Sequence, residues 1–283
     1  MMNAKHSHPL ILLREIEKGE WAMEMPRITV EIDDRLDEGI DWMRSGGFRK
    51  ATAIFCQLIK ELPEHLDAYH HLALTLQRSG KRKQAADVWR CAVDLALKFF
   101  PERFDFDRHQ LSWLDIDNRP FLRAYHGLGV CLLDEDQIEP ALEIFERLLT
   151  LNPHDNQGAR ALVVGCYFEL QRSEEVLSVC RQHAKDGMEQ LVYGRPLALF
   201  QLGRLTTATT ALNRAIKFLP LIAKELGKKQ HRRPRGSNDE YVTMGGADQA
   251  YGYWKDHGKH WHQTPGALDW LKDCLKSEQS GTT

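Results

Sequence analysis

Apolar and small side chains recur at helical spacing along most of the chain. In residues 122–155 they fall on two faces separated by a polar stretch, and this pattern predicts two helices that form a hairpin. Small residues stand where the two backbones must approach each other, at Gly129 in the first helix and Ala141 in the second. Pro153 prevents the second helix from continuing. Because neither helix can bury its apolar face alone, we expect this hairpin to be one unit of a stacked series.

The same pattern returns in other parts of the chain. Residues 32–65 repeat it with small, aromatic and apolar residues and a proline at matching offsets: Gly39, Trp42, Ala51, Phe55, Leu58 and Pro63. Residues 66–99 follow in unbroken register, and residues 189–222 keep the half that forms the second helix. Glycines share the offset at which the first helix of a repeat ends and the chain turns: Gly46, Gly80 and Gly203.

The repeat length of 34 residues and its small–aromatic–small–proline pattern resemble the tetratricopeptide repeat over most of residues 32–222. The resemblance implies an all-α fold, an α-solenoid of about five helical hairpins that stack on one another. Such arrays need a terminal cap, and residues 246–283 are predicted to form one because their pattern indicates two helices. The second of these helices would begin with Thr264 as its cap and Pro265 in its first turn.

Residues 100–121 form an insertion between the second and third repeats. Its many aromatic residues predict that it folds back onto the array instead of forming a disordered linker. A helix start is predicted at Asp117 or Asn118, with Pro120 at the first helical position. The insertion is also rich in aspartate, but the spacing does not match a calcium-binding loop, which needs a central glycine and a closing glutamate. We therefore expect solvated carboxylates and a helix cap there.

The fourth and fifth repeats are irregular. Residues 156–188 run one residue short, and Glu175 stands where the other repeats have alanine. The helical hairpin is expected to survive this change, whereas the close crossing of its helices is not. Pro196 is expected to start or kink the first helix of the fifth repeat.

Two segments lie outside the repeats. In the N-terminal lead segment, residues 1–31, the pattern predicts a short helix over residues 10–25 that ends before Pro26. The residues that follow alternate like a strand, but a single strand would have no partner in a helical chain. We interpret them as an extended entry segment or as the start of the first helix. Residues 223–245 form a basic linker before the tail.

Two short segments carry a second resemblance. The sequence NRPFLR at residues 118–123 and the sequence TPGALDWL at residues 264–271 resemble a group of tetratricopeptide-like proteins. The tail of that group is similar to the tail of the tumorigenicity-suppressor-seven family. The resemblance covers a small part of the chain and implies no known activity, so it bears on the architecture and leaves the function open.

The composition is that of an ordinary globular protein, with 283 residues, 28% charged and 42% hydrophobic residues, and a net charge of -2. Nothing in this balance points to nucleic acid as the main partner. Near the N-terminus only Leu10, Ile11, Leu12 and Leu13 stand together as apolar residues, too few for a signal peptide or a membrane span. We therefore expect a cytoplasmic protein without a membrane partner. The 6 cysteines are scattered without a close pair, which indicates reduced thiols with a structural role.

The sequence carries little that points to catalysis. It has no nucleophile elbow, no phosphate-binding glycine loop and no zinc-protease helix motif, so we predict no enzyme activity and no cofactor. The closest set of metal ligands is His257, His260 and His262 beside Asp256, but this spacing places only two of the imidazoles on one helix face. We predict no metal site. A metal-dependent accessory protein or enzyme that uses this histidine-rich tail is the alternative.

A second alternative is nucleic-acid binding through the basic linker. Six cationic residues stand close together in it: Lys224, Lys228, Lys229, Arg232, Arg233 and Arg235. Such a run can bind phosphates or an acidic partner. It has no aromatic residues among its charges, however, and a solvated linker is the simpler interpretation.

The resemblance to tetratricopeptide repeats implies that the first helix of each repeat lines a concave groove. The positions that would face this groove carry a mixture of cationic and aromatic side chains: Asp37, Arg44, His70, His71, Arg78, Arg123, His126, Arg160, Tyr167, Phe168, Tyr193 and Phe200. Arginine offers directional hydrogen bonds to carboxylates, and tyrosine offers contact area at a low entropy cost. The alternative is that these side chains are merely solvated or are covered by the insertion.

We therefore predict a non-catalytic scaffold or adaptor that binds an extended acidic or aromatic peptide of a protein partner in its groove. The residues predicted to contact that partner are His71, Arg123, His126, Arg160, Tyr167 and Tyr193.

One known class of partner does not suit this groove. Tetratricopeptide domains that hold the acidic C-termini of chaperones resemble one another in a carboxylate clamp made of lysine and asparagine. At the corresponding positions this chain has Leu36, Ile40 and His71, and Arg123 alone has the right charge. We expect a chaperone C-terminus to bind weakly or not at all.

Overall fold

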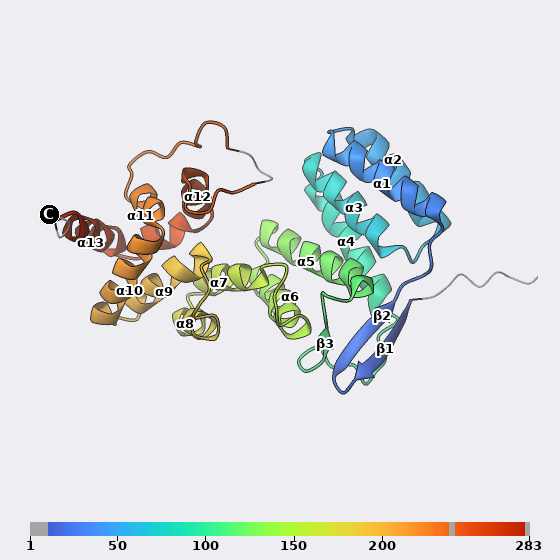
Figure 1. Cartoon of the computed structure of the whole chain (residues 1–283), viewed down its shortest axis with the longest axis horizontal. Helices are drawn as coiled ribbons and strands as arrows, with labels where there is room; N and C mark the ends of the chain where they lie inside the picture. Colours follow the sequence, from blue (N-terminus) through green and yellow to red (C-terminus); the bar gives the residue numbers. More distant parts are fainter. Residues whose placement is uncertain (1–10, 238–240, 281–283) are drawn as a thin grey trace, which may run out of the picture. The chain divides into compact units, whose positions relative to one another are not determined.

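The computed structural model describes residues 11–237 and 241–280. The chain divides into two compact units, unit 1 from Met1 to Ala159 and unit 2 from Arg160 to Thr283 (Figure 1). Helices form most of both units, as the repeat pattern predicted, and a small three-stranded sheet belongs to unit 1. The first ten residues of the predicted lead segment and the last three of the tail lie outside the described residues.

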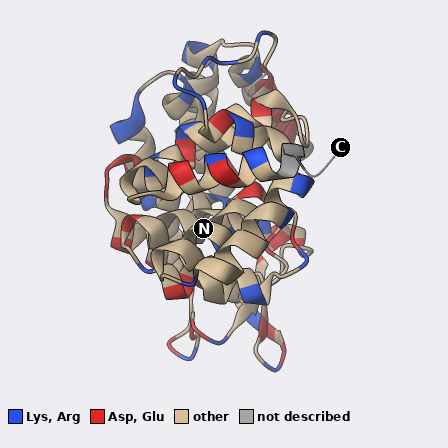
Figure 2. Ribbon diagram, turned by 90° about the vertical axis from the view of Figure 1, so that its left-hand side faces the viewer, with Lys and Arg blue, Asp and Glu red and all other residues tan. Residues whose placement is uncertain are grey.

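Acidic and basic residues are interspersed along the helices that Figure 2 shows. This mixture fits the net charge of -2. None of the helices in the described ranges is both long enough and apolar enough to span a bilayer.

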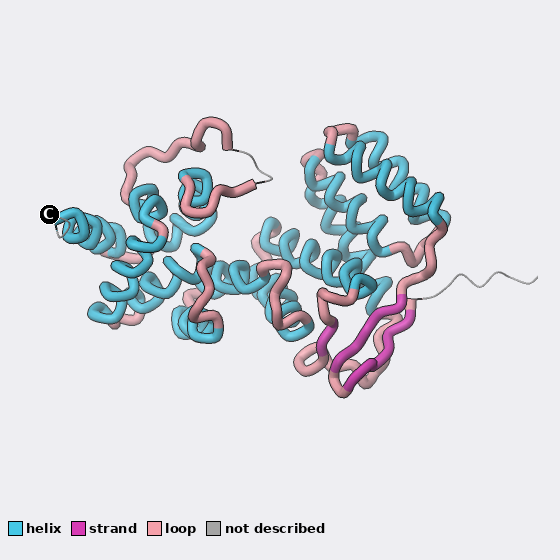
Figure 3. The backbone as a smooth tube through the Cα atoms, viewed as in Figure 1, coloured by secondary structure: helices cyan, strands magenta, loops and turns pink. Residues whose placement is uncertain are grey.

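Unit 1 contains three helical hairpins, whose turns are drawn as loops in Figure 3. Their helices are α1 (Val30–Arg44) and α2 (Phe48–Glu61), α3 (Leu66–Arg78) and α4 (Arg82–Leu97), and α5 (Arg119–Asp134) and α6 (Ile138–Leu151). The first hairpin turns at Gly46 and the second at Gly80, both with φ of +81°, a left-handed conformation that glycine adopts without strain.

The repeat register predicted from the sequence is confirmed by how the helices cross. A Cβ atom at Gly39 would lie 2.5 Å from Cε1 of Phe55, and one at Gly129 would lie 2.7 Å from Cε1 of Phe145. Each glycine therefore makes room for the aromatic ring of the second helix of its own hairpin. Ala141, at the predicted crossing point, is fully buried.

The predicted helix over residues 10–25 is wrong. The segment forms an antiparallel hairpin of β1 (Leu12–Glu17) and β2 (Glu20–Glu24), and β3 (Gln110–Leu111) pairs with β2 in parallel. Burial alternates along β2, where Trp21 and Met23 are buried. The apolar residues of β1 that favoured a helix are instead exposed, Leu12 by 47% and Ile16 by 62%. The strand that completes the sheet comes from the distant insertion, so the local pattern could not show it.

The insertion packs onto the array, as predicted. The ring of Phe106 lies 6.3 Å from that of Tyr125 on α5, and the guanidinium of Arg147 on α6 lies 5.6 Å from the ring of Phe106. The predicted place of the helix start is confirmed, since α5 begins at Arg119, after Asn118 and a short 3-10 turn (Ile116–Asn118). Pro120 is the second helical residue and not the first, and the side chain of Asn118 does not cap the helix. The side chain of Asn118 is buried and accepts a hydrogen bond from the backbone N–H of Met23 at 2.8 Å. This bond ties the sheet to the start of α5.

Unit 2 is helical throughout its described elements. Its helices are α7 (Ala159–Glu169), α8 (Ser173–Gln182), α9 (Glu189–Gln201), α10 (Leu205–Phe218), α11 (Pro220–Leu226), α12 (Ala247–Gln263) and α13 (Ala267–Ser280). In the fourth repeat Glu175, which stands where the other repeats have alanine, is exposed. The next residue, Val176, is buried in its place. Pro196 lies inside α9, and this helix therefore does not begin at the proline.

The tail forms two helices, as predicted, and they pack on the first helices of unit 2. The ring of His260 in α12 stacks on Phe168 of α7 at 5.2 Å, and Trp270 in α13 stacks on Phe200 of α9 at 4.5 Å. Lys259 of α12 also forms an ion pair with Glu169 of α7. The tail thus covers side chains, Phe168 and Phe200, that the repeat pattern predicts to line an open groove.

The predicted role of Thr264 as the cap of the last helix is wrong. Thr264 ends α12, where its hydroxyl donates to the carbonyl oxygen of His260 at 2.7 Å. The same hydroxyl accepts a hydrogen bond from Nε2 of Gln201 at 2.8 Å. It therefore fixes the end of α12 to α9, while α13 begins after Gly266, whose φ is +78°.

Candidate functional site

The six residues predicted to contact a partner are divided equally between the two units. His71 lies on α3, and Arg123 and His126 lie on α5 of unit 1. Arg160 and Tyr167 lie on α7, and Tyr193 lies on α9 of unit 2. Each unit therefore presents its own set, and the two sets differ in what surrounds them.

The three residues in unit 2 have protein neighbours and little exposed surface. Tyr193 is fully buried, and its hydroxyl donates to the carbonyl oxygen of Leu219 at 2.8 Å. Its ring lies 6.3 Å from Trp261 of α12. Arg160 forms an ion pair with Asp186, and Tyr167 is buried. These side chains therefore stabilise unit 2 itself.

Two of the three residues in unit 1, His71 and His126, form a row of imidazole rings with His70, and Arg123 lies near this row. His70 and His71 of α3 lie with ring centroids 5.2 Å apart. His71 stacks on Phe55 at 5.9 Å, and His126 lies edge-on to Phe145 at 5.7 Å. Phe55 and Phe145 are the same rings that face Gly39 and Gly129.

The imidazoles of this row are neutral at pH 7. Burial lowers the pKa of His71 from 6.5 to about 4, and the positive charge of Arg123 also lowers it. Burial also lowers the pKa of His126, and it lowers the pKa of His70 well below its usual value of 6.5. Nδ1 of His71 and Nε2 of His126 are buried and have no hydrogen-bond partner within the described residues. Unpaired buried polar atoms of this kind are costly.

Arg123 is held by contacts on two sides. Its Nη1 donates to Oδ1 of Asp67 at 2.9 Å, and its guanidinium lies 5.7 Å from the ring of Trp113. Arg119 lies over the same ring at 5.4 Å, and its Nε donates to the backbone oxygen of Trp113 at 2.8 Å. The side chain of Arg123 keeps 33% of its surface exposed. It is therefore oriented in advance and still accessible.

Arg123 also lines a cavity of about 430 Å³ at the N-terminal ends of α3 and α5. Arg27 and Arg119 contribute further positive charge, and His65 lies beside them. The segment that precedes α1 forms an apolar wall with Met25, Pro26 and Ile28. Arg27 and Arg119 are not among the residues that the sequence predicts to contact a partner. The motif NRPFLR, which contains Arg119, was the signal that could have found the latter.

The tail histidines of the alternative hypothesis lie against α7. His260 is buried against Phe168, and a Cβ atom at Gly165 would lie 3.5 Å from Cε1 of His257. Burial lowers the pKa of both histidines to about 4. His262 is exposed. Across the described part of the chain, no three histidine, cysteine or acidic side chains are grouped as metal ligands would be.

The basic linker is attached to unit 2 near its start. Lys228 forms an ion pair with the buried Glu225, and Nδ1 of His231 lies 3.0 Å from Oε1 of the same residue. The ring of His231 stacks on Trp254 of α12 at 3.8 Å. Arg232 and Arg235 are exposed. The positive charge of Lys228 is thus neutralised by an acidic residue of unit 2 itself.

Solved structures that resemble this chain share its fold. The crystal structure of MamA protein is similar with a TM-score of 0.52 and 17% identity, over 72% of this chain and 98% of that chain. A kinesin light chain from Podosopora anserina, with nearly identical TPR-like repeats, is similar with a TM-score of 0.50 and 15% identity, over 66% and 94%. Among proteins of curated function, none matches significantly. At these identities the likeness shows a tetratricopeptide-like helical repeat and no function.

The sequence pattern of a protein family extends over most of the chain. It matches residues 52–280, from the first repeat to the last tail helix. The match includes both segments that carried the second resemblance, at residues 118–123 and 264–271. The chain therefore belongs to the family described as transcriptional repressor TCF25.

Proposed function

We propose that this chain is a non-catalytic protein-interaction module and that unit 1 binds an extended, acidic segment of a partner protein. The observation that carries the proposal is the 33% exposed side chain of Arg123, oriented by Asp67 and Trp113, on the face that also carries the half-buried imidazoles of His71 and His126. The corresponding first helices of unit 2 are covered by α12 and α13. Unit 1 is therefore the better place for a ligand.

The chemistry of the surface favours carboxylates. Arginine offers several N–H donors in a planar arrangement, and the bond to Asp67 uses one terminal nitrogen. Neutral imidazoles can donate a hydrogen bond to a carboxylate or accept one from a backbone N–H. Hydrogen bonds in which the donor or the acceptor is charged, such as those to a carboxylate, are about twice as strong as bonds between neutral groups. The cavity beside Arg123, which three arginines and the two aspartates Asp67 and Asp117 line, extends the surface that an acidic segment could follow.

The description of the family assigns it to transcriptional repression. We propose that this chain contributes to such a process by holding another protein and not by catalysis. A cytoplasmic location and the exclusion of chaperone C-termini stay predictions.

The proposal can be tested by capturing partners on the full chain and measuring the affinity of the bound partner segment as a synthetic peptide. Arg123→Gln should weaken the peptide at least tenfold, because a charge-assisted bond is lost. Asp67→Asn should strengthen it, because Arg123 is released from a competing carboxylate. Arg90→Gln on α4, which removes an exposed arginine that pairs with Asp87, is the control and should change nothing.

Arg123→Gln is expected to weaken an acidic ligand and Asp67→Asn to strengthen it. Both substitutions break the ion pair between Asp67 and Arg123. A loss of affinity in both variants would therefore indicate damage to the fold. Unchanged affinity in both would place the ligand elsewhere and contradict the proposal.

A further inference from the structure

Unit 2 has a groove beside α8 and α10, the second helices of its two hairpins. The groove exists because α8 is short. α8 contains 10 residues, whereas α2, α6 and α10 contain 14 each. α8 ends at Gln182, and residues 183–188 continue as an irregular loop. The difference is about one helical turn. The C-terminal half of α10 therefore lacks the helical neighbour that a full-length α8 would supply.

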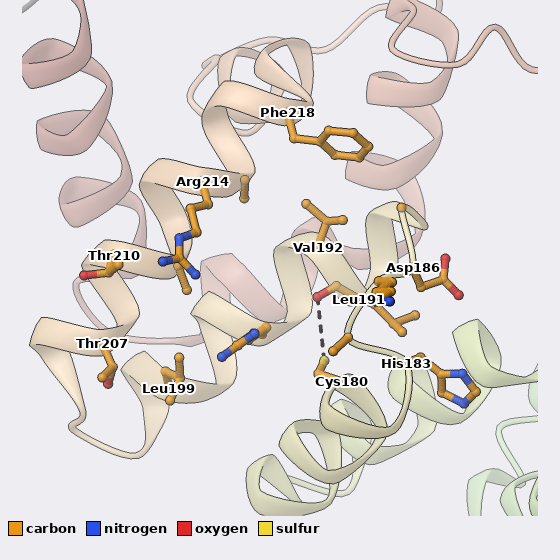
Figure 4. A pocket seen from close by; sticks show the side chains of 16 residues that line it. Cys180, His183, Asp186, Leu191, Val192, Leu199, Thr207, Thr210, Arg214 and Phe218 are labelled. Atoms are coloured by element: carbon orange, nitrogen blue, oxygen red, sulfur yellow. Dashed lines mark hydrogen bonds between the residues drawn. The ribbon is translucent and has the colours of Figure 1, made fainter.

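The uncovered space is a groove of about 580 Å³ between α8, α9 and α10 (Figure 4). Apolar residues of α9 and α10 line it, among them Leu191, Leu199 and Ala211. Phe218 lies at the end of α10 and is 58% exposed. A Cβ atom at Gly187 would lie 3.2 Å from Cζ of Phe218, so the loop after α8 approaches the groove at this end.

The charges around the groove are mainly positive. Lys185, Arg195 and Arg214 line it and are exposed. Within the described residues none of these three forms an ion pair, whereas Asp186 is paired with Arg160. An apolar groove with unpaired cations beside it is complementary to an apolar segment that carries carboxylates.

We propose that this groove binds a short amphipathic helix of a partner protein, with its apolar face against α10 and its aspartates or glutamates facing Arg195 and Arg214. Such a helix would occupy the place that the missing turn of α8 leaves open. Helices recognised in this way present apolar residues at positions i, i+3, i+4 and i+7 to the groove. The groove belongs to unit 2 and is separate from the Arg123 surface of unit 1, so this site does not depend on the function proposed above.

The experiment is a selection of random 16-residue peptides, displayed on phage, on the immobilised full chain. The Arg195→Glu/Arg214→Glu double variant serves for counter-selection. We expect enriched peptides with helical apolar spacing and several acidic residues. Their affinity for the double variant should be at least tenfold lower than for the unaltered chain. Replacing the acidic residues of a selected peptide with lysine should restore binding to the double variant.

Arg232→Glu/Arg235→Glu is the matched control. It makes the same change in net charge at exposed positions of the basic linker and should leave binding of the selected peptides unchanged. Ala211→Arg, which fills the groove, should abolish binding, and Arg123→Gln should have no effect. Circular dichroism of each variant checks that the fold is kept.

Two outcomes would overturn the proposal. In the first, no enriched peptide distinguishes the unaltered chain from Arg195→Glu/Arg214→Glu. In the second, sedimentation shows a concentration-dependent dimer that the same variant dissociates, which would assign the groove to a second copy of this chain.

Discussion

Glycines in the first helices of unit 1 decide how closely an aromatic ring can approach. Gly39 faces Phe55 within its own hairpin, and Gly127 of α5 faces Trp89 of the preceding hairpin, where a Cβ atom would lie 2.4 Å from Cε2 of the indole. A methyl group at such a position must displace a ring that is itself enclosed by other side chains. The smallest residue is therefore required by packing, since these glycines have helical backbones.

Gly127→Ala and Gly129→Ala should each lower the free energy of unfolding by about 1–3 kcal/mol, because overpacking in a close-packed core has this cost. Thermal and urea denaturation of the full chain would measure it. Gly252→Ala in α12 is the control, because a Cβ atom added there would meet nothing within 4 Å. That change should stabilise the chain by about 0.5–1 kcal/mol, as alanine does in place of glycine inside a helix. Equal effects at all three positions would contradict the packing argument.

Buried histidines should make the stability depend on pH. Burial lowers the pKa of His257 and His260 from 6.5 to about 4, with the charge of Lys259 lowering both further and Glu169 raising that of His257. Well above pH 6.5 these imidazoles are neutral in the folded and the unfolded chain. Between pH 6.5 and about 4 the unfolded chain binds protons that the folded chain does not, so the free energy of unfolding falls as the pH falls.

His257→Gln/His260→Gln should therefore reduce the loss of thermal stability between pH 7 and pH 5. The measurement is the change in Tm over this range, compared with the unaltered chain, and not the Tm at one pH. An identical change in both proteins would mean that other groups cause the acid sensitivity.

At the scale of single elements, α12 does more than close the end of a repeat array. Its Trp261 is fully buried, contacts Tyr193 of α9 and donates a hydrogen bond to the hydroxyl of Tyr253 at 3.2 Å. The concave side of unit 2 is thus filled by the chain's own tail. A ligand for these first helices would have to displace α12.

Trp261→Ala should lower the free energy of unfolding by about 3–5 kcal/mol, because a large buried ring is replaced by a cavity. His262→Ala, the next residue along the same helix, is exposed and should change it by less than about 0.5 kcal/mol. Chemical denaturation followed by far-UV circular dichroism, which does not rely on tryptophan fluorescence, would compare them. A small effect of Trp261→Ala would show that α12 is only loosely attached to unit 2.

At the scale of the whole molecule, the division into two compact units predicts that damage stays local. Gly127→Ala disturbs the contact of α5 with Trp89, and both lie in unit 1. Hydrogen exchange of the full chain should therefore increase in α3 to α5 and stay unchanged in α9 to α12, because each unit has its own buried core. Faster exchange in both units would show that they unfold as one.

The helical repeats and their register could be predicted from local spacing alone. Gly129, Ala141, Phe145 and Pro153 each act through neighbours within one hairpin, so their positions in the sequence were enough to predict where helices cross and end. The turn glycines and the start of α5 after Asn118 were predictable for the same reason. Arg123, His71 and His126 could be assigned to one surface because adjacent repeats place equivalent positions side by side.

Contacts between distant segments, in contrast, became visible only in the folded chain. The pairing of β2 with β3 joins Trp21 to Leu111, and Asn118 bonds to Met23, contacts between segments whose local patterns say nothing of each other. In the same way, the sequence placed Tyr193 in an open groove, whereas the tail covers it. Periodicity reveals that a face is apolar or aromatic, but the same face can be buried by a partner, by solvent-excluding side chains or by the chain itself. The choice depends on long-range packing, which no local pattern contains.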